Sequence, residues 1–290
     1  MHDIAVPAEM RDWSRVERQR GRRIAYVPTM GFLHEGHLRL VDRARERADR
    51  VVVSSFVNPL QFGAEEDFDS YPRDPARDRR LAAERGVDCL FAPATQSLYP
   101  ETPVIRIAPG PMADVLEGAA RPGHFEGVLT VLTKLFHLVA PDLAVFGRKD
   151  FQQAILVRRM VRDLEFGFEI DIAPTVRELD GLALSSRNAY LTPDERRAAL
   201  ALSRALRAVE QAWRGGQADP AALEHRGLEV LRAPGVAPEY LALVDEDLRP
   251  VARADARTAV VVAARVGKTR LIDNVVLGEG LVNDVAVRVS

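Results

Sequence analysis

The chain has 290 residues, which fits one large or two medium domains, and its 47% apolar residues suffice for a packed core. Forty basic residues against 42 acidic ones give a net charge of -2, so nothing points to nucleic acid or an anionic membrane as a partner. The absence of a long apolar run and of an apolar N-terminal signal core argues against a membrane protein, and one cysteine excludes a disulfide framework. We therefore expect a cytoplasmic protein.

Strands and helices alternate along the first part of the chain. In chain order, the pattern predicts a helix at Met10–Arg20, a strand at Ile24–Val27, a helix over 38–48, a strand at Val51–Phe56, a helix from Asp74-Pro75 to Gly86, a strand at Val87–Ala92, a short strand at Val104–Ile107, a helix at Gly127–Val139, a strand at Leu143–Phe146, a helix at about Phe151–Leu164 and a strand at Glu169–Ala173. Such alternation predicts an α/β fold with a doubly wound, Rossmann-like parallel sheet. Ligands in these sheets bind at the carboxyl ends of the strands.

The pattern changes after Ser186. A capping box at Thr192–Glu195 begins a helix that runs to about Arg214, and Asp219-Pro220 begins another. Strands are predicted at Tyr240–Val244, Thr258–Ala264 and Arg270–Asp273. Helices followed by strands predict a smaller α+β domain, so we expect two domains, 1–175 and 176–290.

The stretch Val27–Leu38 joins the first predicted strand of the sheet to its helix. Its glycine-bearing turn suits an anion, because backbone N–H groups at a helix N-terminus lack intrahelical partners and the helix dipole favours negative charge. His34 and His37 lie three residues apart, on one face of the helix start, and can donate hydrogen bonds to one phosphate group. The stretch therefore predicts a nucleotide phosphate site.

The histidine pair also allows other interpretations. A histidine in a turn is often a solvated or capping residue, and two histidines at this spacing can form half of a zinc site. Zinc would need further ligands nearby, and the single cysteine, Cys89, lies in a predicted buried strand. The sequence therefore disfavours zinc.

Four later loops carry polar residues that suit ligand binding. Gln61 lies in the loop Asn58–Gly63, and Arg121 and His124 lie at a predicted helix start. Lys149 follows a strand and a glycine at the next helix N-terminus, where it suits a phosphate. Ser185-Ser186-Arg187 offers two hydroxyls and a fork of donors for leaving phosphates. Taken singly, each loop also reads as an ordinary surface loop, a cap or a hinge.

Taken together, these strings resemble a known family. His-x-Gly-His after a first strand resembles the nucleotidylyl-transferase superfamily and the class I aminoacyl-tRNA synthetases, and the longer Val27–Leu38 string is similar to the pantothenate synthetase family. The strings that match this family, in its order, are Val27–Leu38, Phe56–Phe62, Asp69–Arg73, Arg121–Val128, Phe146–Gln153, Val176–Asn188 and Leu271–Asn274. The resemblance covers essentially the whole chain.

The resemblance implies an activity and partners. Pantoate and β-alanine would be condensed with ATP to pantothenate, through a pantoyl-adenylate, with release of AMP and pyrophosphate. It also implies Mg²⁺ and a homodimer formed through the N-terminal domain, with partners that are small-molecule substrates and neither nucleic acid nor membrane. Domain 1–175 would bind the nucleotide and pantoate, and domain 176–290 would act as a lid that excludes water.

The resemblance also implies site residues. His34, His37 and Lys149 would be catalytic, with His37 acting either as a general acid or as a phosphate clamp. The implied ATP contacts are Thr29, Met30, Gly31, His34, Gly36, His37, Phe146, Gly147, Lys149, Asp150, Val176, Leu184, Ser185, Ser186 and Arg187. The implied contacts to pantoate or β-alanine are Met30, Gln61, Gln153, Asn58, Tyr71, Arg121 and His124.

Three positions call for separate comment. Asp78 is a speculative metal contact, and an exposed helix carboxylate is the competing interpretation. Leu184 stands where the family usually has methionine, a mild change of similar volume. Arg148 stands where an acidic residue is expected, and it either adds positive charge near the nucleotide or points to solvent.

The sequence leaves two alternative functions open and contains two motif-like stretches that do not fit their motifs. The chain could be another His-x-Gly-His nucleotidylyl-transferase, with no β-alanine site, or a nucleotide-binding module without catalysis. Gly267-Lys268-Thr269 resembles the end of a Walker A loop, but Val262 occupies the position of the required glycine, so a hairpin turn is predicted instead. Gly278-x-Gly280 lacks the rest of a dinucleotide fingerprint.

Overall fold

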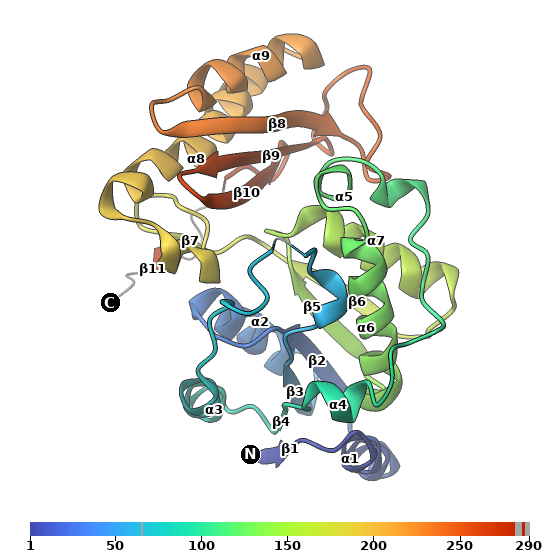
Figure 1. The fold of residues 1–290 in the computed structure, drawn as a ribbon. Coiled ribbons are helices and arrows are strands. Elements are labelled where there is room, and N and C mark those ends of the chain that lie inside the picture. Colours follow the sequence, from blue (N-terminus) through green and yellow to red (C-terminus); the bar gives the residue numbers. More distant parts are fainter. Residues whose placement is uncertain (65, 282–285, 288–290) are drawn as a thin grey trace. The chain divides into compact units, whose positions relative to one another are not determined.

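The computed structural model describes residues 1–64, 66–281 and 286–287, and its contacts divide the chain into two compact units (Figure 1). Unit 1 comprises Met1–Gly147 and Gln152–Ala173. Unit 2 comprises Arg148–Phe151 and the chain from Pro174 onward. The segment Arg148–Phe151 thus groups with unit 2, although it interrupts unit 1 in sequence. The predicted boundary at 175/176 and the predicted roles of the two domains stay predictions.

Unit 1 contains a sheet in which every strand pair is parallel. Its elements are β1 (His2–Ile4), α1 (Pro7–Gln19), β2 (Ile24–Thr29), α2 (Glu35–Arg45), β3 (Arg50–Ser55), η1 (Pro59–Gln61), α3 (Pro75–Glu84), β4 (Cys89–Phe91), α4 (Thr95–Leu98), η2 (Pro111–Ala113), α5 (Glu117–Ala120), α6 (His124–Val139), β5 (Leu143–Gly147), α7 (Phe151–Asp163) and β6 (Glu169–Ala173). The strand order is β1-β4-β3-β2-β5-β6. The order reverses at β2, so the predicted doubly wound α/β sheet is confirmed and its switch point lies between β2 and β5.

Both faces of this sheet are covered by helices, which explains its continuous apolar strands. Ile24 and Tyr26 of β2 lie in one apolar cluster with residues of α1, α6 and α7. Ala25 and Val27, which alternate with them, lie in a second cluster with residues of α2 and α3. The ribbon shows the corresponding layers, helix on sheet on helix (Figure 1).

Two strand assignments in unit 1 need correction. The strand predicted at Val104–Ile107 is wrong: these described residues form no strand, and Val104 and Ile105 are 93% and 83% exposed. The Ile107 N–H donates instead to the Thr130 hydroxyl, at 3.0 Å, so its backbone is satisfied by a side chain of α6. The short edge strand β1 was not predicted, because only one of its three residues, Ile4, is buried.

Unit 2 is built on an antiparallel sheet with the strand order β10-β9-β8. Its elements are β7 (Arg177–Glu178), η3 (Ser186–Tyr190), α8 (Pro193–Arg214), α9 (Pro220–Leu231), β8 (Val236–Val244), β9 (Ala259–Val266), β10 (Thr269–Val276) and β11 (Ala286–Val287). Residues of α8 and α9 share one apolar cluster with the three strands. The predicted smaller α+β domain is confirmed, as are the capping box at Thr192–Glu195 and the hairpin turn at Gly267-Lys268.

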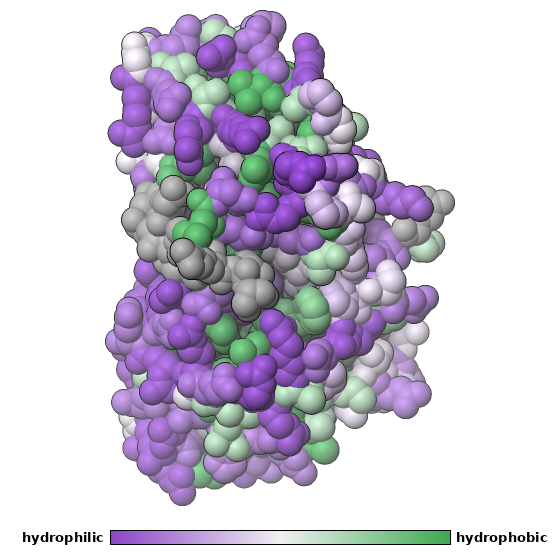
Figure 2. All heavy atoms as spheres, turned by 90° about the vertical axis from the view of Figure 1, so that its left-hand side faces the viewer, coloured by the Kyte–Doolittle hydropathy of each residue, from purple (hydrophilic) through white to green (hydrophobic). Residues whose placement is uncertain are grey.

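Hydrophilic side chains cover most of the face shown in Figure 2, and apolar residues form small separate areas on it. No helix among the described residues has the length and apolar character needed to cross a bilayer.

A close contact in unit 1 places η1 directly against α6. Gly127 lies in the first turns of α6, and a Cβ built on it would collide with the Leu60 carbonyl group and lie 2.7 Å from the Cα of Gln61. The Asn58 amide donates to the Gly127 carbonyl at 3.0 Å and ties the two segments together. Only glycine fits this contact, which sets the position of the predicted substrate residue Gln61.

We predict that Gly127→Ala destabilises the protein by about 1–3 kcal/mol through overpacking. The usual effect of replacing glycine by alanine within a helix is the opposite, a gain of about 0.5–1 kcal/mol in the free energy of unfolding. Urea unfolding followed by circular dichroism measures the change, and Glu126→Ala, at the exposed neighbouring position, should shift stability by less than about 0.5 kcal/mol. A Gly127→Ala protein more stable than wild type would show that no steric contact exists.

Candidate functional site

The turn from β2 to α2 has a left-handed backbone at two consecutive residues. Gly31 has φ +81° and Phe32 has φ +50°. A Cβ on Gly31 would collide with the Ser55 hydroxyl and lie 2.9 Å from a carboxylate oxygen of Asp78. Glycine is therefore required at position 31 by space as well as by conformation. At Phe32, the unfavourable conformation must be held by the surroundings.

Two side chains of α3 hold this turn. The Asp78 carboxylate accepts the Phe32 N–H at 2.8 Å and the Leu33 N–H at 2.7 Å, one on each oxygen. The Arg77 guanidinium donates to the Leu33 carbonyl at 2.7 Å and lies 5.3 Å from the centre of the Phe32 ring. Burial raises the pKa of Asp78, and the two backbone N–H groups oppose the rise. Asp78 is 2% exposed, so the interpretation as an exposed helix carboxylate does not apply.

His34 and His37 stack on one another at the start of α2. Their ring centres are 4.0 Å apart, with 27° between the ring planes. His34 is the N-cap, and its Nδ1 accepts the Gly36 N–H at 3.1 Å, while the Nδ1 of His37 accepts the His34 N–H at 3.4 Å. A nitrogen that accepts carries no proton, so each neutral ring has its N–H at Nε2. Both rings then offer an Nε2–H donor at a helix N-terminus, an arrangement suited to a phosphate group.

Gln61 is held between two predicted site residues. Its Oε1 accepts from the Asn58 amide at 3.2 Å, and its Nε2 lies 3.0 Å from the Met30 sulfur. Asn58 also accepts from the Leu60 N–H and from the Tyr99 hydroxyl, and it is 1% exposed. The structure therefore brings Met30, Asn58 and Gln61 together and gives Asn58 a positioning role within the loop.

Arg121 and His124 form a buried pair against the same loop. Arg121 makes two hydrogen bonds of 2.7 Å to the Glu66 carboxylate and donates to Nε2 of His124 at 3.0 Å. His124 Nδ1 lies 2.8 Å from the Gln61 carbonyl oxygen, so Nδ1 is the donor and Nε2 the acceptor. Burial, with the charge of Arg121 adding to it, lowers the pKa of His124 to about 4. Burial raises the pKa of Glu66, but the bonds to Arg121 outweigh it, and that pKa lies below its usual value.

The remaining predicted residues of unit 1 lie at strand ends, in a loop and at a helix start. Thr29 donates to the Ser54 carbonyl at 2.6 Å, which joins the ends of β2 and β3. Phe146 is buried at the end of β5, beside Gly147. Tyr71 is buried, with its ring 6.0 Å from that of Phe62. Gln153 is half-buried in the first turn of α7.

In unit 2, Lys149 lies on a turn whose neighbours are both charged. The Lys149 amine is 3.6 Å from the Asp150 carboxylate, and its side chain is 20% exposed. Arg148 makes an ion pair with Glu279. The Arg148 side chain is 17% exposed and is engaged within unit 2, so it does not point freely to solvent. Its effect on charge near the nucleotide stays a prediction.

The segment Val176–Asn188 contains β7, an isolated antiparallel bridge between Arg177 and Ala183, and the first residues of η3. Ser185 caps η3 by accepting the Arg187 N–H at 3.3 Å, and Ser186 is 8% exposed. The Leu184 N–H donates to the Val176 carbonyl at 3.0 Å, which brings those two predicted residues together. The hydroxyls and the arginine of Ser185–Arg187 thus follow a backbone fixed by its own hydrogen bonds.

Two positioning residues were not predicted from the sequence, Arg177 of this segment and Asn274 of β10. Arg177 makes bonds of 2.6 and 2.8 Å to both oxygens of Asp273, and both side chains are at least 97% buried. Asn274, the next residue, donates to the carbonyls of Arg148 and Lys149. The signal available in the sequence was Leu271–Asn274, a polar pair in an apolar strand, which matched the family without suggesting a role.

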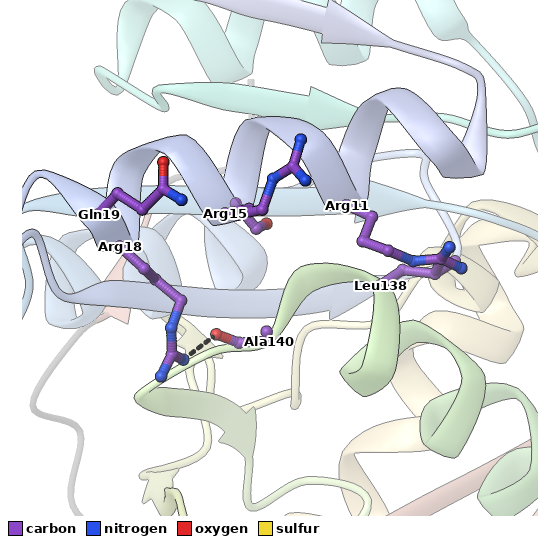
Figure 3. Close-up of a pocket in the computed structure, with 7 residues that line it drawn as sticks. Arg11, Arg15, Arg18, Gln19, Leu138 and Ala140 are labelled. Atoms are coloured by element: carbon purple, nitrogen blue, oxygen red, sulfur yellow. Dashed lines mark hydrogen bonds between the residues drawn. The ribbon is translucent and has the colours of Figure 1, made fainter.

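The structure also shows a hollow of about 420 Å³ beside α1 (Figure 3). Its lining residues are Arg11, Ser14, Arg15, Arg18, Gln19, Leu138 and Ala140. Arg18 donates to the Ala140 carbonyl at 2.7 Å, as the dashed line shows, and Ala140 is the left-handed C-cap of α6 (Figure 3). No predicted site residue lines this hollow.

Comparisons with known proteins agree with this geometry. A family model described as Pantoate-beta-alanine ligase matches residues 3–276. The chain is 51% identical over 280 residues to the pantothenate synthetase of Moorella thermoacetica, covering 96% of this chain and 99% of that protein. It is 51% identical over 271 residues to the pantothenate synthetase of Heliobacterium modesticaldum, covering 93% and 96%.

Solved structures give the same result. The crystal structure of pantothenate synthetase from Thermus thermophilus superposes with a TM-score of 0.90 at 48% identity, covering 96% of this chain and 99% of that one. The pantoate-β-alanine ligase from Francisella tularensis, solved in complex with β-γ ATP and β-alanine, gives a TM-score of 0.80 at 32% identity, covering 97% and 100%. These findings support the ligase and not the alternative nucleotidylyl-transferase. The chain belongs to the pantoate-β-alanine ligase family.

Proposed function

We propose that this enzyme first joins pantoate to the AMP portion of ATP and then transfers the pantoyl group to β-alanine. In the first step the pantoate carboxylate attacks the α-phosphorus and pyrophosphate leaves, giving a pantoyl-adenylate. In the second step the β-alanine amine attacks the carbonyl carbon of this mixed anhydride and AMP leaves. The observation that carries the proposal is the stacked pair of histidine rings at the N-terminus of α2, beside the switch point of the sheet.

The proposed roles follow from charge. Two anions must approach one another in the first step, so the enzyme has to align them and neutralise the charge that develops. His34, His37 and the start of α2 stabilise the α-phosphate in the transition state. Lys149 and Ser185–Arg187 bind the β- and γ-phosphates. The other proposed ATP contacts are Thr29, Met30, Gly31, Gly36, Phe146, Gly147, Asp150, Val176 and Leu184.

Pantoate is proposed to bind at Gln61 and Gln153, which offer amide donors and acceptors for its hydroxyl and carboxylate oxygens. Arg121 and His124 are proposed to line the pantoate site beside Gln61. Asn58 and Tyr71 are proposed to support these lining residues. The ATP and β-alanine named for the Francisella tularensis structure support this choice of substrates.

Mg²⁺ belongs to the proposal as a partner of the ATP phosphates. Among the described residues no group of three or more His, Cys, Asp or Glu side chains forms a metal site. Mg²⁺ commonly keeps several waters and binds substrate phosphates with only one or two protein carboxylates, so this chain fits an ion held mainly by ATP. The ion would supply charge neutralisation on the leaving pyrophosphate. Asp78 remains the proposed protein contact.

We also propose that the enzyme acts in the cytoplasm as a homodimer formed through its N-terminal domain, as the family resemblance implies. Burial raises the pKa of the single cysteine, Cys89, to about 12, so its thiol stays protonated and unreactive.

An AMP-release assay tests the overall reaction. Purified enzyme receives ATP and Mg²⁺ with pantoate alone, β-alanine alone, or both. Steady turnover is expected only with both acids, and pyrophosphate release with pantoate alone should be limited to about one equivalent of enzyme. Steady turnover that depends on neither acid would overturn the proposal.

We predict that His37→Ala lowers the rate of pantoate-dependent pyrophosphate formation about 10²- to 10³-fold, because one donor to the developing phosphate charge is lost. Rapid-quench measurement of pyrophosphate at saturating ATP gives the rate. His225→Ala, at a 72% exposed histidine of α9, is the matched control and should match wild type. His37→Gln separates the two roles: a clamp keeps much of its activity with an amide donor, whereas a general acid loses it. A His37→Ala rate equal to wild type excludes both.

The Asp78→Asn variant should lose about 1–3 kcal/mol of stability, because its NH₂ group faces one of the two backbone N–H groups that Asp78 now accepts. The histidine turn would shift with it, so we expect kcat to fall about tenfold or more. Glu84→Gln, an exposed carboxylate of the same helix, is the control. Kinetics at low and high Mg²⁺ distinguish the roles, since recovery at high Mg²⁺ would assign Asp78 to the metal rather than to the turn.

His124 predicts a pH dependence of stability. Its pKa in the folded protein, about 4, lies below its usual value of 6.5, although Glu66 and Glu117 pull the pKa upward. Below about pH 6.5 the unfolded chain binds a proton that the folded protein does not, so this residue costs stability increasingly from pH 6.5 down to 4, by about 3 kcal/mol at most. The wild-type free energy of unfolding should therefore fall relative to His124→Asn over this range. Urea titrations at several pH values measure the difference, and a constant difference contradicts the prediction.

A further inference from the structure

Asn274 on β10 makes two hydrogen bonds to the turn that carries Lys149. Its Nδ2 donates to the Arg148 carbonyl at 2.9 Å and to the Lys149 carbonyl at 3.0 Å. An amide nitrogen has two hydrogens, so these bonds use its full donor capacity. Asn274 is 3% exposed, and all three residues belong to unit 2. The donor amide is therefore buried, while the two carbonyls that accept from it belong to a half-buried turn.

These two bonds fix the backbone of one residue. The Arg148 carbonyl belongs to the peptide plane before the Lys149 Cα, and the Lys149 carbonyl belongs to the plane after it. Because peptide units are planar, holding both oxygens near one amide restrains the two dihedral angles of Lys149. The direction in which its side chain leaves the backbone is then restrained as well. The ion pair between Arg148 and Glu279 adds a second anchor to the same turn.

The anchor residue is itself rigidly held. The Asn274 N–H donates to the Asp273 carboxylate at 2.7 Å, and its carbonyl accepts from Arg177 at 3.3 Å. Arg177 and Asp273 form the buried bidentate pair described above. Asn274 also lies in the register of β10 against β9, opposite Val261. The backbone from which the Asn274 amide extends is therefore fixed, although its Oδ1 accepts no hydrogen bond among the described residues.

We propose that Asn274 is a positioning residue for ATP binding, which acts by holding the backbone of Lys149 so that its amine meets the phosphates. This inference rests on the proposed role of Lys149. The chemistry requires asparagine at this position: aspartate has the same size, but its carboxylate would place a negative oxygen against two carbonyl oxygens. The charge would repel the turn that the amide now holds.

The test uses Asn274→Asp and Asn274→Ala in the full-length enzyme. We expect kcat/KM for ATP to fall about 10- to 100-fold, the loss that a displacement of about 1 Å produces, and more for Asp than for Ala. The KM for β-alanine should change less than about twofold, because the second step does not use the β- and γ-phosphates. Thermal unfolding confirms that each variant is folded.

Val275→Ala is the matched control. Val275 is the next residue of β10, is 2% exposed and belongs to the core of unit 2. Its truncation weakens the same strand without touching the Lys149 turn, so kcat/KM for ATP should stay near wild type even if stability falls. If Val275→Ala lowers kcat/KM for ATP as much as Asn274→Ala, the effect is general destabilisation and the inference is overturned.

A double-mutant cycle with Lys149→Ala separates the inference from the function on which it rests. If Asn274 acts through Lys149, Asn274→Ala has little further effect once the lysine is gone. Full additivity would overturn the positioning role while leaving the role of Lys149 intact. An unchanged kcat/KM for ATP in Lys149→Ala alone would overturn the proposed role of Lys149, and with it this inference.

Discussion

The hydrogen bonds from Phe32 and Leu33 to the Asp78 carboxylate are the constraint on which the candidate phosphate site of unit 1 depends. The chain must turn sharply between β2 and α2, and it does so with positive φ at Gly31 and at Phe32. An aromatic residue does not hold that conformation unaided. The buried carboxylate accepts hydrogen bonds from two adjacent N–H groups that would otherwise lack a partner in this turn. These bonds therefore fix the position at which α2 begins, and with it the position of the stacked histidines.

Unit 2 holds its own candidate phosphate residues in a comparable way. In unit 1 a carboxylate binds two consecutive N–H groups, and in unit 2 the Asn274 amide binds two consecutive carbonyls. Each anchor lies far along the chain from the turn it holds, and each is almost fully buried. Neither Asp78 nor Asn274 contacts a substrate in our proposal. Each one positions the backbone of residues that are proposed to bind substrate. Each anchor suits the backbone groups it binds: a carboxylate accepts from two N–H groups, and an amide NH₂ donates to two carbonyls.

Much of the fold could be predicted from the sequence, because its signals are local. Periodicity and caps located β2, α2, β3 and α8, and the family strings located the candidate residues. The tertiary anchors could not be predicted this way. Nothing near Asp78 in sequence shows that it reaches the turn after β2, and the ion pair of Arg148 with Glu279 joins residues far apart in the chain. The apolar run Val104–Ile107 misled for the opposite reason: its local pattern favours a strand, but its backbone is satisfied by Thr130 without one.

The glycines show how the two kinds of information combine. The sequence indicates glycine at a turn, but only the structure distinguishes conformation from space as its cause. Gly31 is required for both reasons, because its φ is positive and a Cβ would meet Ser55. Gly127 lies within a helix, where alanine would normally be favoured, so its presence makes sense only through the contact with Leu60 and Gln61. Gly127 costs helix stability, but it lets the loop that carries Gln61 pack directly against α6. Placement of Gln61 therefore explains this glycine. The packing of α6 is in this way linked to the proposed binding of pantoate.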